Sequence, residues 1–474
     1  MNNTVSKNPL LANTSPECFT YLQTHSERFL NELIEWCKIP SISSIAAYQA
    51  EMRRAAEFGA GLLRAAGLEN VAVLPTAGHP LAYGEWLKAG PGAPTVLFYG
   101  HYDVQPALQA ELWETPPFEP SVRGDCLYGR GASDMKGQTM AEIKAIEAVL
   151  QTQGRLPINV KVLLDGEEEI GSRSLRAFIT ENQARLACDY AVNPDAGMCS
   201  ADQPSITYAL RGGVRVNLTV YGPQQDLHSG VFGGTLHNPA QALAELIAGM
   251  HNAQGRVTLP GFYERVRPLE AEERHMLAQL PVNDAFFLQS SGAPALWGEP
   301  EFTPYERTTA RPTLEVLSFQ AGLPGEGVLN IVPAKASAAL SMRLVPDQDP
   351  QEAYQSLLRY LEAQAPPTIR WEAQYIGGGR GALVRRDQPG MQAMYRALHA
   401  TWGVAPRFSR QGGGIAVVGQ LQQIMGVDSV MTGFGLPDDN IHGPNEHLHL
   451  PTWRKGIQAL VHFLFEAAPR GTAL

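Results

Sequence analysis

Hydrophobic and polar positions follow one pattern through most of the first half of the chain. Leu22, Phe29, Leu33 and Trp36 recur at near-helical spacing before Pro40, which predicts an amphipathic helix. Beyond it, short apolar runs alternate with helical stretches, which predicts βαβ units and a largely parallel sheet flanked by helices. The runs are TVLFYG (95–100), INVKVLLDG (158–166) and DYAVNP (189–194), and the helical stretches are TMAEIKAIEAVLQ (139–151) and SLRAFITENQARL (174–186).

A second pattern begins near residue 213. The stretches GVRVNLTVYG (213–222) and ASAALSMRLVP (336–346) alternate between apolar and polar residues, which is typical of antiparallel strands buried on one face. Two helix candidates, 238–253 and 350–364, accompany these strands.

These two patterns predict an α/β protein with an inserted domain. Residues 1–212 and 381–474 would form the larger domain, with the parallel sheet. Residues 213–380 would form a smaller α+β domain, and the glycine-rich stretch IGGGRGA (376–382) would join it to the last part of the chain.

The composition argues against several classes of protein. With 44% apolar and 18% charged residues, the 474-residue chain has an ordinary globular composition. Its formal charge of −10, without a Lys/Arg cluster, argues against a nucleic-acid partner. The polar N-terminus and the lack of a run of about 18 apolar residues argue against export and a membrane partner. The five scattered cysteines form no CxxC pair, which fits a reducing cytoplasm.

Side chains that can bind metal ions follow several of the predicted strands. Because ligands of open α/β sheets bind at the carboxyl ends of the strands, we expect these side chains to converge at one edge. Histidines and carboxylates without thiolates suit Zn²⁺ or Mn²⁺. The candidates are His101 and Asp103 in GHYDVQP, Asp134 in GRGASDMKGQ, Glu167, Glu168 and Glu169 in DGEEEIGS, Asp195 in NPDAG, and His442 in DDNIHGPNEHLHL.

Each of these fragments also has a purely structural interpretation. His101 and Asp103 can form a hydrogen-bonded turn, and Asp134 can cap the helix that follows it. Consecutive glutamates are most often a solvated surface, and Asp195 and His442 can lie in polar loops. Their joint occurrence at predicted strand ends favours a common metal site.

The order of the motifs resembles the co-catalytic zinc peptidase family that includes carnosinases, cytosolic nonspecific dipeptidases, aminoacylases and glutamate carboxypeptidases. The resemblance extends from CKIPSIS to the last helix and is greatest to the dipeptidase branch. The motifs that carry it are GHYDVQP, GRGASDMKGQ, DGEEEIGS, NPDAG, DLHSGVFGG, SMRLVP and IHGPNE.

The resemblance implies a centre with two metal ions. His101 and Asp195 would hold one ion, Glu169 and His442 would hold the other, and Asp134 would bridge them.

Other residues of this centre would act without binding a metal ion. Glu168 would be the general base. Asp103 would orient the ring of His101 through its carboxylate. The family also carries a cis peptide after the bridging aspartate, which is the bond between Asp134 and Met135 in this chain.

The same resemblance implies residues that contact the substrate. His228 would donate to the oxyanion, and Arg343 would hold the substrate carboxylate. Gly414 stands where dipeptidases usually have a serine, so the N–H groups of Gly413 and Gly414 would replace its hydroxyl. Asn330 stands where relatives often have a threonine. The structural alternatives are a helix cap for His228, an exposed strand position for Arg343 and a turn for Asn330.

The sequence thus predicts a cytoplasmic dipeptidase with two bound divalent ions, Zn²⁺ or Mn²⁺. It would hydrolyse short peptides with a free C-terminal carboxylate by means of a metal-activated water and a glutamate base. The resemblance also implies a homodimer that forms through the inserted domain, with His228 completing the site of the partner. An N-acyl amino acid deacylase is the alternative enzyme. A metal-dependent binding protein is disfavoured, since a binder needs no free carboxylate at Glu168.

Overall fold

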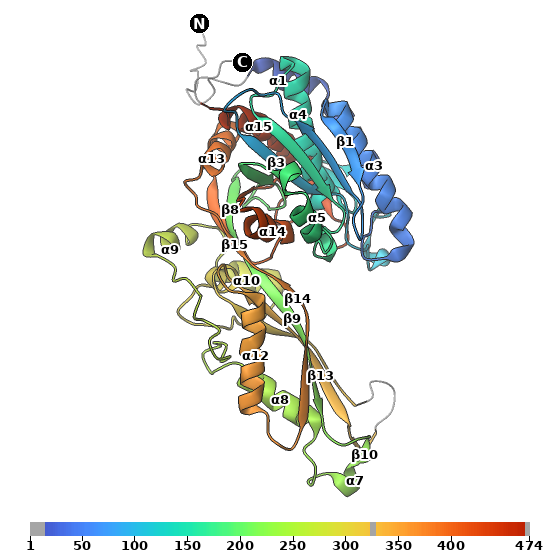
Figure 1. Ribbon diagram of the computed structural model, residues 1–474, viewed down its shortest axis with the longest axis vertical. Coiled ribbons are helices and arrows are strands. Elements are labelled where there is room, and N and C mark those ends of the chain that lie inside the picture. The colour runs from blue at the N-terminus through green and yellow to red at the C-terminus, as the bar shows by residue number, and fades with distance from the viewer. Residues whose placement is uncertain (1–14, 323–328, 470–474) are drawn as a thin grey trace. The chain divides into compact units, whose positions relative to one another are not determined.

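The computed structural model describes residues 15–322 and 329–469, and the chain divides into two compact units (Figure 1). Unit 1 comprises residues 1–208, 384–409 and 415–474, and unit 2 comprises residues 209–383 and 410–414. Within the described residues, no helix has the length and apolar character needed to cross a membrane. The short return of residues 410–414 to unit 2 was not indicated by the sequence pattern.

A mixed nine-stranded sheet has the order β1-β2-β6-β3-β7-β17-β8-β15, with β16 paired to β8; most of its strands belong to unit 1, whereas β15 and the last residues of β8 and β16 belong to unit 2. Its strands are β1 (Glu69–Leu74), β2 (Leu81–Trp86), β3 (Thr95–His101), β6 (Asn159–Asp165), β7 (Tyr190–Asn193), β8 (Ser205–Leu210), β15 (Ala382–Leu383), β16 (Arg407–Gln411) and β17 (Ser429–Met431). β3 pairs in parallel with β6 and β7, and β7 pairs in parallel with β17. The predicted largely parallel arrangement is confirmed at the centre of the sheet, while β1 and β2 form an antiparallel edge.

Helices cover this sheet. Every residue of β3 from Val96 to His101 is buried, as is typical of parallel strands covered on both faces. α4 packs against α1, α3 and α15, α15 packs against α13, and α5 packs against α14 (Figure 1). The helices of unit 1 are α1 (Pro16–Thr24), α2 (Ser26–Cys37), α3 (Gln49–Ala66), α4 (Gln138–Gln153), α5 (Leu175–Glu181), α6 (Gln183–Leu186), α13 (Pro389–Trp402), α14 (Ala416–Met425) and α15 (Leu450–Glu466).

The first amphipathic helix predicted from the sequence is two helices. α1 ends at Thr24 and α2 begins at Ser26, with His25 between them in a non-helical conformation (φ −105°, ψ 9°). The His25 ring nitrogen Nδ1 lies 3.0 Å from the carbonyl oxygen of Tyr21, which the His25 backbone N–H also contacts at 3.0 Å. This local hydrogen bonding competes with continuation of the helix.

Unit 2 contains an antiparallel sheet in the order β11-β13-β9-β14, with α8 and α12 packed on it (Figure 1). The predicted alternation is confirmed, because Val214, Val216 and Leu218 of β9 and Leu340 and Met342 of β13 point into one core with residues of both helices. β14 continues to Gly379, through most of the glycine-rich stretch predicted as a joint, with a register shift between Tyr375 and Gly377. The elements of unit 2 are β9 (Gly212–Tyr221), β10 (Leu227–His228), β11 (Thr313–Ala321), β12 (Ile331–Val332), β13 (Lys335–Leu344), β14 (Arg370–Gly379), α7 (Ser229–Phe232), α8 (Pro239–Gly249), α9 (Ala271–Leu277), α10 (Asp284–Ser291), α11 (Pro304–Thr309) and α12 (Pro350–Gln364).

A glycine lets α15 lie close to the segment that follows β17. A Cβ atom added at Gly456 would lie 2.4 Å from the ring of Phe434, which is fully buried. Gly61, in the middle of α3, has no atom within 4 Å of such a Cβ. The two helical glycines therefore differ in the space around them.

We predict that Gly456→Ala destabilises the protein and that Gly61→Ala does not. The methyl group at position 456 overpacks the core, at a cost of about 1–3 kcal/mol. Gly61→Ala, the matched control, should raise the free energy of unfolding by about 0.5–1 kcal/mol, because alanine restricts the unfolded chain. Urea denaturation measures both effects, and equal stability of the two variants would contradict the close packing of α15.

Candidate metal centre

The candidate centre lies at the carboxyl ends of parallel strands in unit 1. His101 is the last residue of β3, and Asp195 follows β7 by two residues. Glu168 and Glu169 lie in a short turn after β6. Since β3 lies between β6 and β7, the three strand ends bring these residues to one edge of the sheet, as the sequence predicted.

Two loops complete the centre. Asp134 lies in the turn Ala132–Gly137, directly before α4, and its peptide bond to Met135 is cis, as the family resemblance implied. His442 lies in the loop after β17 and has a left-handed backbone conformation (φ 63°). That conformation is uncommon for a residue other than glycine, and such residues cluster at functional sites.

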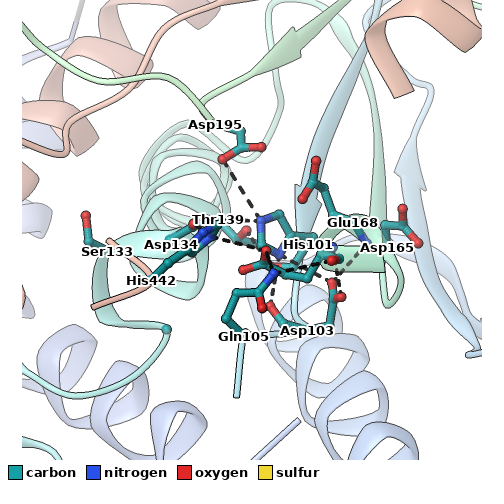
Figure 2. Close-up of polar contacts among 12 residues, drawn as sticks. His101, Asp103, Gln105, Ser133, Asp134, Thr139, Asp165, Glu168, Asp195 and His442 are labelled. Atoms are coloured by element: carbon teal, nitrogen blue, oxygen red, sulfur yellow. Dashed lines mark hydrogen bonds and ion pairs between the residues drawn. The ribbon is translucent and has the colours of Figure 1, made fainter. Parts of the chain in front are cut away.

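The two carboxylate oxygens of Asp134 face two different histidines. Oδ1 lies 3.2 Å from Nε2 of His101, and Oδ2 lies 2.9 Å from Nε2 of His442. Nε2 of His101 is also 4.0 Å from Oδ1 of Asp195, and Nε2 of His442 is 3.2 Å from Oε2 of Glu169. Figure 2 shows Asp134 close to His442 and His101, with Asp195 on the side of His101. This is the arrangement expected of a carboxylate that bridges two ions.

Asp103 supports the centre in two ways. Nδ1 of His101 lies 3.0 Å from the backbone carbonyl oxygen of Asp103 and 3.4 Å from its carboxylate oxygen Oδ1. The carboxylate accepts hydrogen bonds from the N–H groups of Glu168 (3.2 Å) and Glu169 (3.1 Å). Asp103 therefore fixes the His101 ring mainly through its backbone, while its side chain holds the turn that carries both glutamates.

Glu168 and Glu169 have different surroundings. Nε2 of Gln105 donates a hydrogen bond to Oε2 of Glu169 (2.9 Å), the oxygen that also faces His442. The other oxygen, Oε1, is buried without a hydrogen-bond partner in the described part of the chain. No described side chain within hydrogen-bond distance holds the carboxylate of Glu168, which approaches His101 and Asp195. The two neighbouring carboxylates are therefore held differently.

Protons compensate for the crowding of negative charge. Burial and the charge of Asp195 raise the pKa of Glu168 well above its ordinary value. Burial and the charge of Asp134 raise the pKa of Asp195 to about 8. These shifts show that some of the carboxylates would be neutral near pH 7 unless cations balance their charge.

The pKa values of the two histidines are also raised, which for an imidazole favours the charged form. Hydrogen bonds with Asp134 and Glu169 raise the pKa of His442 to about 10. Burial disfavours the charged form of His101, but its hydrogen bonds with Asp103 and Asp134 outweigh burial and raise its pKa well above the ordinary value. Both imidazoles thus carry protons that a metal ion would displace.

The residues present fit divalent metal ions. One ligand atom from each of His101, Glu168 and Asp195 lies within 4.8 Å of the others, and the same holds for His101, Asp134 and Glu169. No lysine or arginine of the described residues pairs with these carboxylates, which leaves the imidazoles as their only close cationic partners. The unpartnered Oε1 of Glu169 offers a further lone pair. Imidazole and carboxylate ligands suit Zn²⁺ and Mn²⁺.

Arg130 and Glu446 join the two loops of the centre, and sequence reasoning assigned neither a role. Oε1 of the fully buried Glu446 accepts hydrogen bonds from the N–H groups of Gly131, Ser133 and Asp134, at 3.0–3.1 Å. Its Oε2 accepts one from Arg130 (2.6 Å), which also donates to the carbonyl oxygen of His442 (3.0 Å). Opposite charges inside two glycine-containing motifs, GRGASDMKGQ and IHGPNE, were the available signal.

His228 and Asn330 lie together in unit 2. His228, in β10, pairs with Ile331 of β12, and the carbonyl oxygen of Asn330 accepts a hydrogen bond from the N–H of Ser229 (2.8 Å). The exposed His228 caps the short helix α7, since its Nδ1 accepts a hydrogen bond from the N–H of Gly230 (3.0 Å). An accepting Nδ1 leaves the proton of a neutral ring on Nε2.

Arg343, Gly413 and Gly414 also lie in unit 2, away from β10. Arg343 is exposed near the end of β13, opposite Gly213 of β9, and the neighbouring Met342 and Leu344 are fully buried. Gly413 and Gly414 belong to the short segment after β16.

Comparisons with known proteins show which family the chain resembles. Residues 97–466 match the model of "Peptidase family M20/M25/M40". The chain is 28% identical over 467 residues to the human Beta-Ala-His dipeptidase, covering 95% of this chain and 92% of the relative. It is 26% identical over 465 residues to the Cys-Gly metallodipeptidase of Candida albicans, covering 94% and 96% of the two chains.

Solved structures show the same likeness. The crystal structure of human carnosine dipeptidase 1 matches with a TM-score of 0.80 at 28% identity, covering 95% of this chain and 98% of the other. An M20 family metallo-carboxypeptidase from Sulfolobus solfataricus matches with a TM-score of 0.83 at 31% identity, covering 93% and 99%. The family resemblance seen in the motifs is thereby confirmed, and because the family model spans more than half of the sequence, the chain belongs to the M20/M25/M40 family of metallopeptidases.

Proposed function

We propose that the protein is a metal-dependent dipeptidase that cleaves the amide bond next to a free C-terminal carboxylate. The observation that carries this proposal is Asp134 placed between His101 and His442, with the carboxylate of Glu168 beside them but not held by a neighbour. The named activities of the relatives, a Beta-Ala-His dipeptidase and a Cys-Gly metallodipeptidase, support dipeptides as the substrate class.

Two divalent ions would bind at the centre, Zn²⁺ or Mn²⁺. His101 and Asp195 would hold one ion, and Glu169 and His442 would hold the other. Asp134 would bind to both ions. This division follows the distances, since each oxygen of Asp134 approaches a different imidazole. When bound, such ions lower the pKa of water and polarise the scissile carbonyl group.

Glu168 would be the general base that transfers a proton during the reaction. Its carboxylate takes a proton from the attacking water and later delivers it to the leaving amine. The hydrogen bond from its backbone N–H to Asp103 keeps the residue in place while its side chain remains free to exchange the proton.

Residues of unit 2 would recognise the substrate. Arg343 would pair with the C-terminal carboxylate through its planar guanidinium, and the N–H groups of Gly413 and Gly414 would donate to the same group. Nε2–H of His228 would donate to the oxyanion, and the amide of Asn330 would contact the substrate beside it.

His228 and Arg343 lie too far apart in one chain to contact the same dipeptide. From Lys335 to Arg343, β13 spans about 26 Å. β10, with His228, lies beyond the Lys335 end of the sheet (Figure 1). An extended dipeptide is only about 7 Å long. If both residues serve one substrate, they must come from two chains, which supports a homodimer.

One edge of the unit 2 sheet suits such a homodimer. β11 is an edge strand, and its side chains Leu317 and Phe319 are 57% and 45% exposed. An exposed apolar edge strand readily pairs with another chain. A second copy of unit 2 would cover this edge.

The five cysteines, all in the described residues, are free thiols. Free thiols are usual in reducing compartments, and we therefore retain the cytoplasm as the proposed location.

A substrate screen tests the proposal. With added Zn²⁺ or Mn²⁺, free dipeptides should be cleaved, and C-terminal amidation should lower kcat/KM by roughly 30- to 150-fold, which is about 2–3 kcal/mol for a lost charge-assisted contact. Chromatography of the products measures both. In Arg343→Gln, the difference between free and amidated dipeptides should shrink. Faster cleavage of N-acyl amino acids than of any dipeptide would identify a deacylase instead.

Mutations should distinguish the roles of the adjacent residues Glu168 and Glu169. Glu168→Gln should retain both metal ions but lower kcat by about 10²–10⁴, because the proton acceptor is lost. Glu169→Gln should lower the metal content as well, because a ligand charge is lost. Elemental analysis and kcat are measured on the same samples. Equal metal loss in the two variants would refute the division of roles.

Mixed dimers test the placement of His228. His228→Ala and Glu168→Gln are each expected to be nearly inactive. After subunit exchange, a mixed dimer contains one site with an intact Glu168 and the His228 of its partner, so activity should return toward half of that of a wild-type dimer. Mass spectrometry checks that exchange occurred. If activity stays at the background of the parents despite exchange, His228 serves its own chain.

A further inference from the structure

Arg211 is a buried cation of unit 2 without a carboxylate partner. The residue is 8% exposed, directly before β9. Its Nε donates to the carbonyl oxygen of Gly412 (2.9 Å), and its Nη1 donates to that of Arg311 (3.2 Å). No carboxylate of the described residues forms an ion pair with it. A buried guanidinium normally has such a partner, so the arrangement leaves a positive charge unbalanced.

A second arginine lies in the same region. Burial and the positive charge of Arg343 lower the pKa of Arg211 to about 10, with Glu315 acting weakly in the opposite direction. Arg343 is paired through its backbone in β13, but within the described parts of the chain its guanidinium forms no hydrogen bond or ion pair. The two guanidiniums therefore repel each other unless an anion lies between or beside them.

The segment next to Arg211 offers further donors. In the described structure, the N–H groups of Gly412, Gly413 and Gly414 donate no hydrogen bond. The segment lies against Arg211, because a Cβ atom at Gly414 would be 2.6 Å from the Arg211 carbonyl oxygen and one at Gly412 would be 3.3 Å from its Nη2. Successive free N–H groups in a glycine-rich turn form an anion-binding concavity.

The residues just before the Gly412–Gly414 segment are also held by hydrogen bonds and an ion pair. The hydroxyl group of Tyr305 donates to the carbonyl oxygen of Arg410 (2.6 Å) and accepts from its N–H (2.9 Å). The guanidinium of Arg410 pairs with Glu273. The N–H of Arg211 donates to the carbonyl oxygen of Gln411 (3.3 Å). The residues before the three glycines are thus held by Tyr305 and Glu273, and Arg211 contacts both Gln411 and Gly412.

We propose that Arg211 is a positioning residue of the carboxylate site: it holds the Gly412–Gly414 segment so that the N–H groups of this segment and the guanidinium of Arg343 bind the C-terminal carboxylate of the substrate. Arginine suits this position because its fork reaches two carbonyl groups in different segments while its charge attracts the anion, whereas a lysine ammonium presents a single point of contact. This inference rests on the proposed function, of which it specifies the substrate-binding end.

The test compares Arg211→Gln and Arg211→Lys with Arg265→Gln, a control in the same unit whose side chain is 59% exposed. The ligands are the dipeptide cleaved best in the screen, or alanyl-alanine if none is cleaved, and the C-terminal amide of the same dipeptide. Calorimetry measures their binding to the metal-free proteins, and kcat and KM are measured on the metal-loaded proteins.

Arg211→Gln should weaken binding of the free dipeptide at least tenfold and raise its KM, while changing binding of the amide less than threefold. Arg211→Lys, which keeps the charge, should fall between wild type and Arg211→Gln. In an Arg343→Gln background the effect of Arg211→Gln should shrink, because both residues act on one carboxylate. The control should match wild type. If Arg211→Gln does not fold, Arg211→Lys must still affect the free dipeptide more than the amide.

Equal losses for the free dipeptide and its amide would overturn the inference, because they would indicate a purely structural role. The outcomes also separate it from the proposed function. If no dipeptide is cleaved but the preference for a free carboxylate depends on Arg211, the proposed function fails and the inference stands. If free dipeptides are cleaved preferentially and Arg211→Gln leaves that preference unchanged, the inference fails alone.

Discussion

The crowding of negative charge at the carboxyl ends of β3, β6 and β7 is the constraint on which the candidate centre depends. Four carboxylates, those of Asp134, Glu168, Glu169 and Asp195, gather around two imidazoles. Without cations, protons must compensate, and the raised pKa values of Glu168 and Asp195 reflect this. Divalent cations would relieve the same repulsion directly, so the side chains that this part of the fold gathers are suited to cation binding.

Buried hydrogen bonds around the centre hold the candidate ligands in place. Glu446 and Arg130 form a buried ion pair, and its ends reach the backbone on both sides, at Asp134 and at His442. The carboxylate of Asp103 accepts hydrogen bonds from the backbone N–H groups of Glu168 and Glu169 and so holds the turn that carries them. In each case a charged group satisfies backbone groups of an irregular loop that no helix or strand can satisfy. Such loops can hold ligands at fixed positions only because these acceptors and donors are buried with them.

The two units carry opposite local charge. Unit 1 gathers carboxylates, whereas unit 2 places Arg211 and Arg343 near the free N–H groups of a glycine segment. The proposed substrate, a peptide with a free C-terminus, would need both kinds of site, one for the metal-assisted reaction at the amide and one for the terminal carboxylate. The family membership agrees with the first kind of site, and the charges of unit 2 supply a physical reason for the second.

The sequence by itself determined five of the strands (β3, β6, β7, β9 and β13) and the contrast between a parallel and an antiparallel sheet, because apolar periodicity records which faces are buried. It also determined the ligand candidates, since His101, Glu169 and Asp195 lie at or just after buried runs. Local pattern could not reveal the break at His25, where a side chain competes for one carbonyl group, or the return of residues 410–414 to unit 2. The tertiary structure alone decided the pairings of Glu446 with Asp134 and of Arg211 with Gly412, which join residues far apart in sequence. The physical reason is that a buried polar group must find a partner wherever packing places one, and periodicity carries no record of that partner.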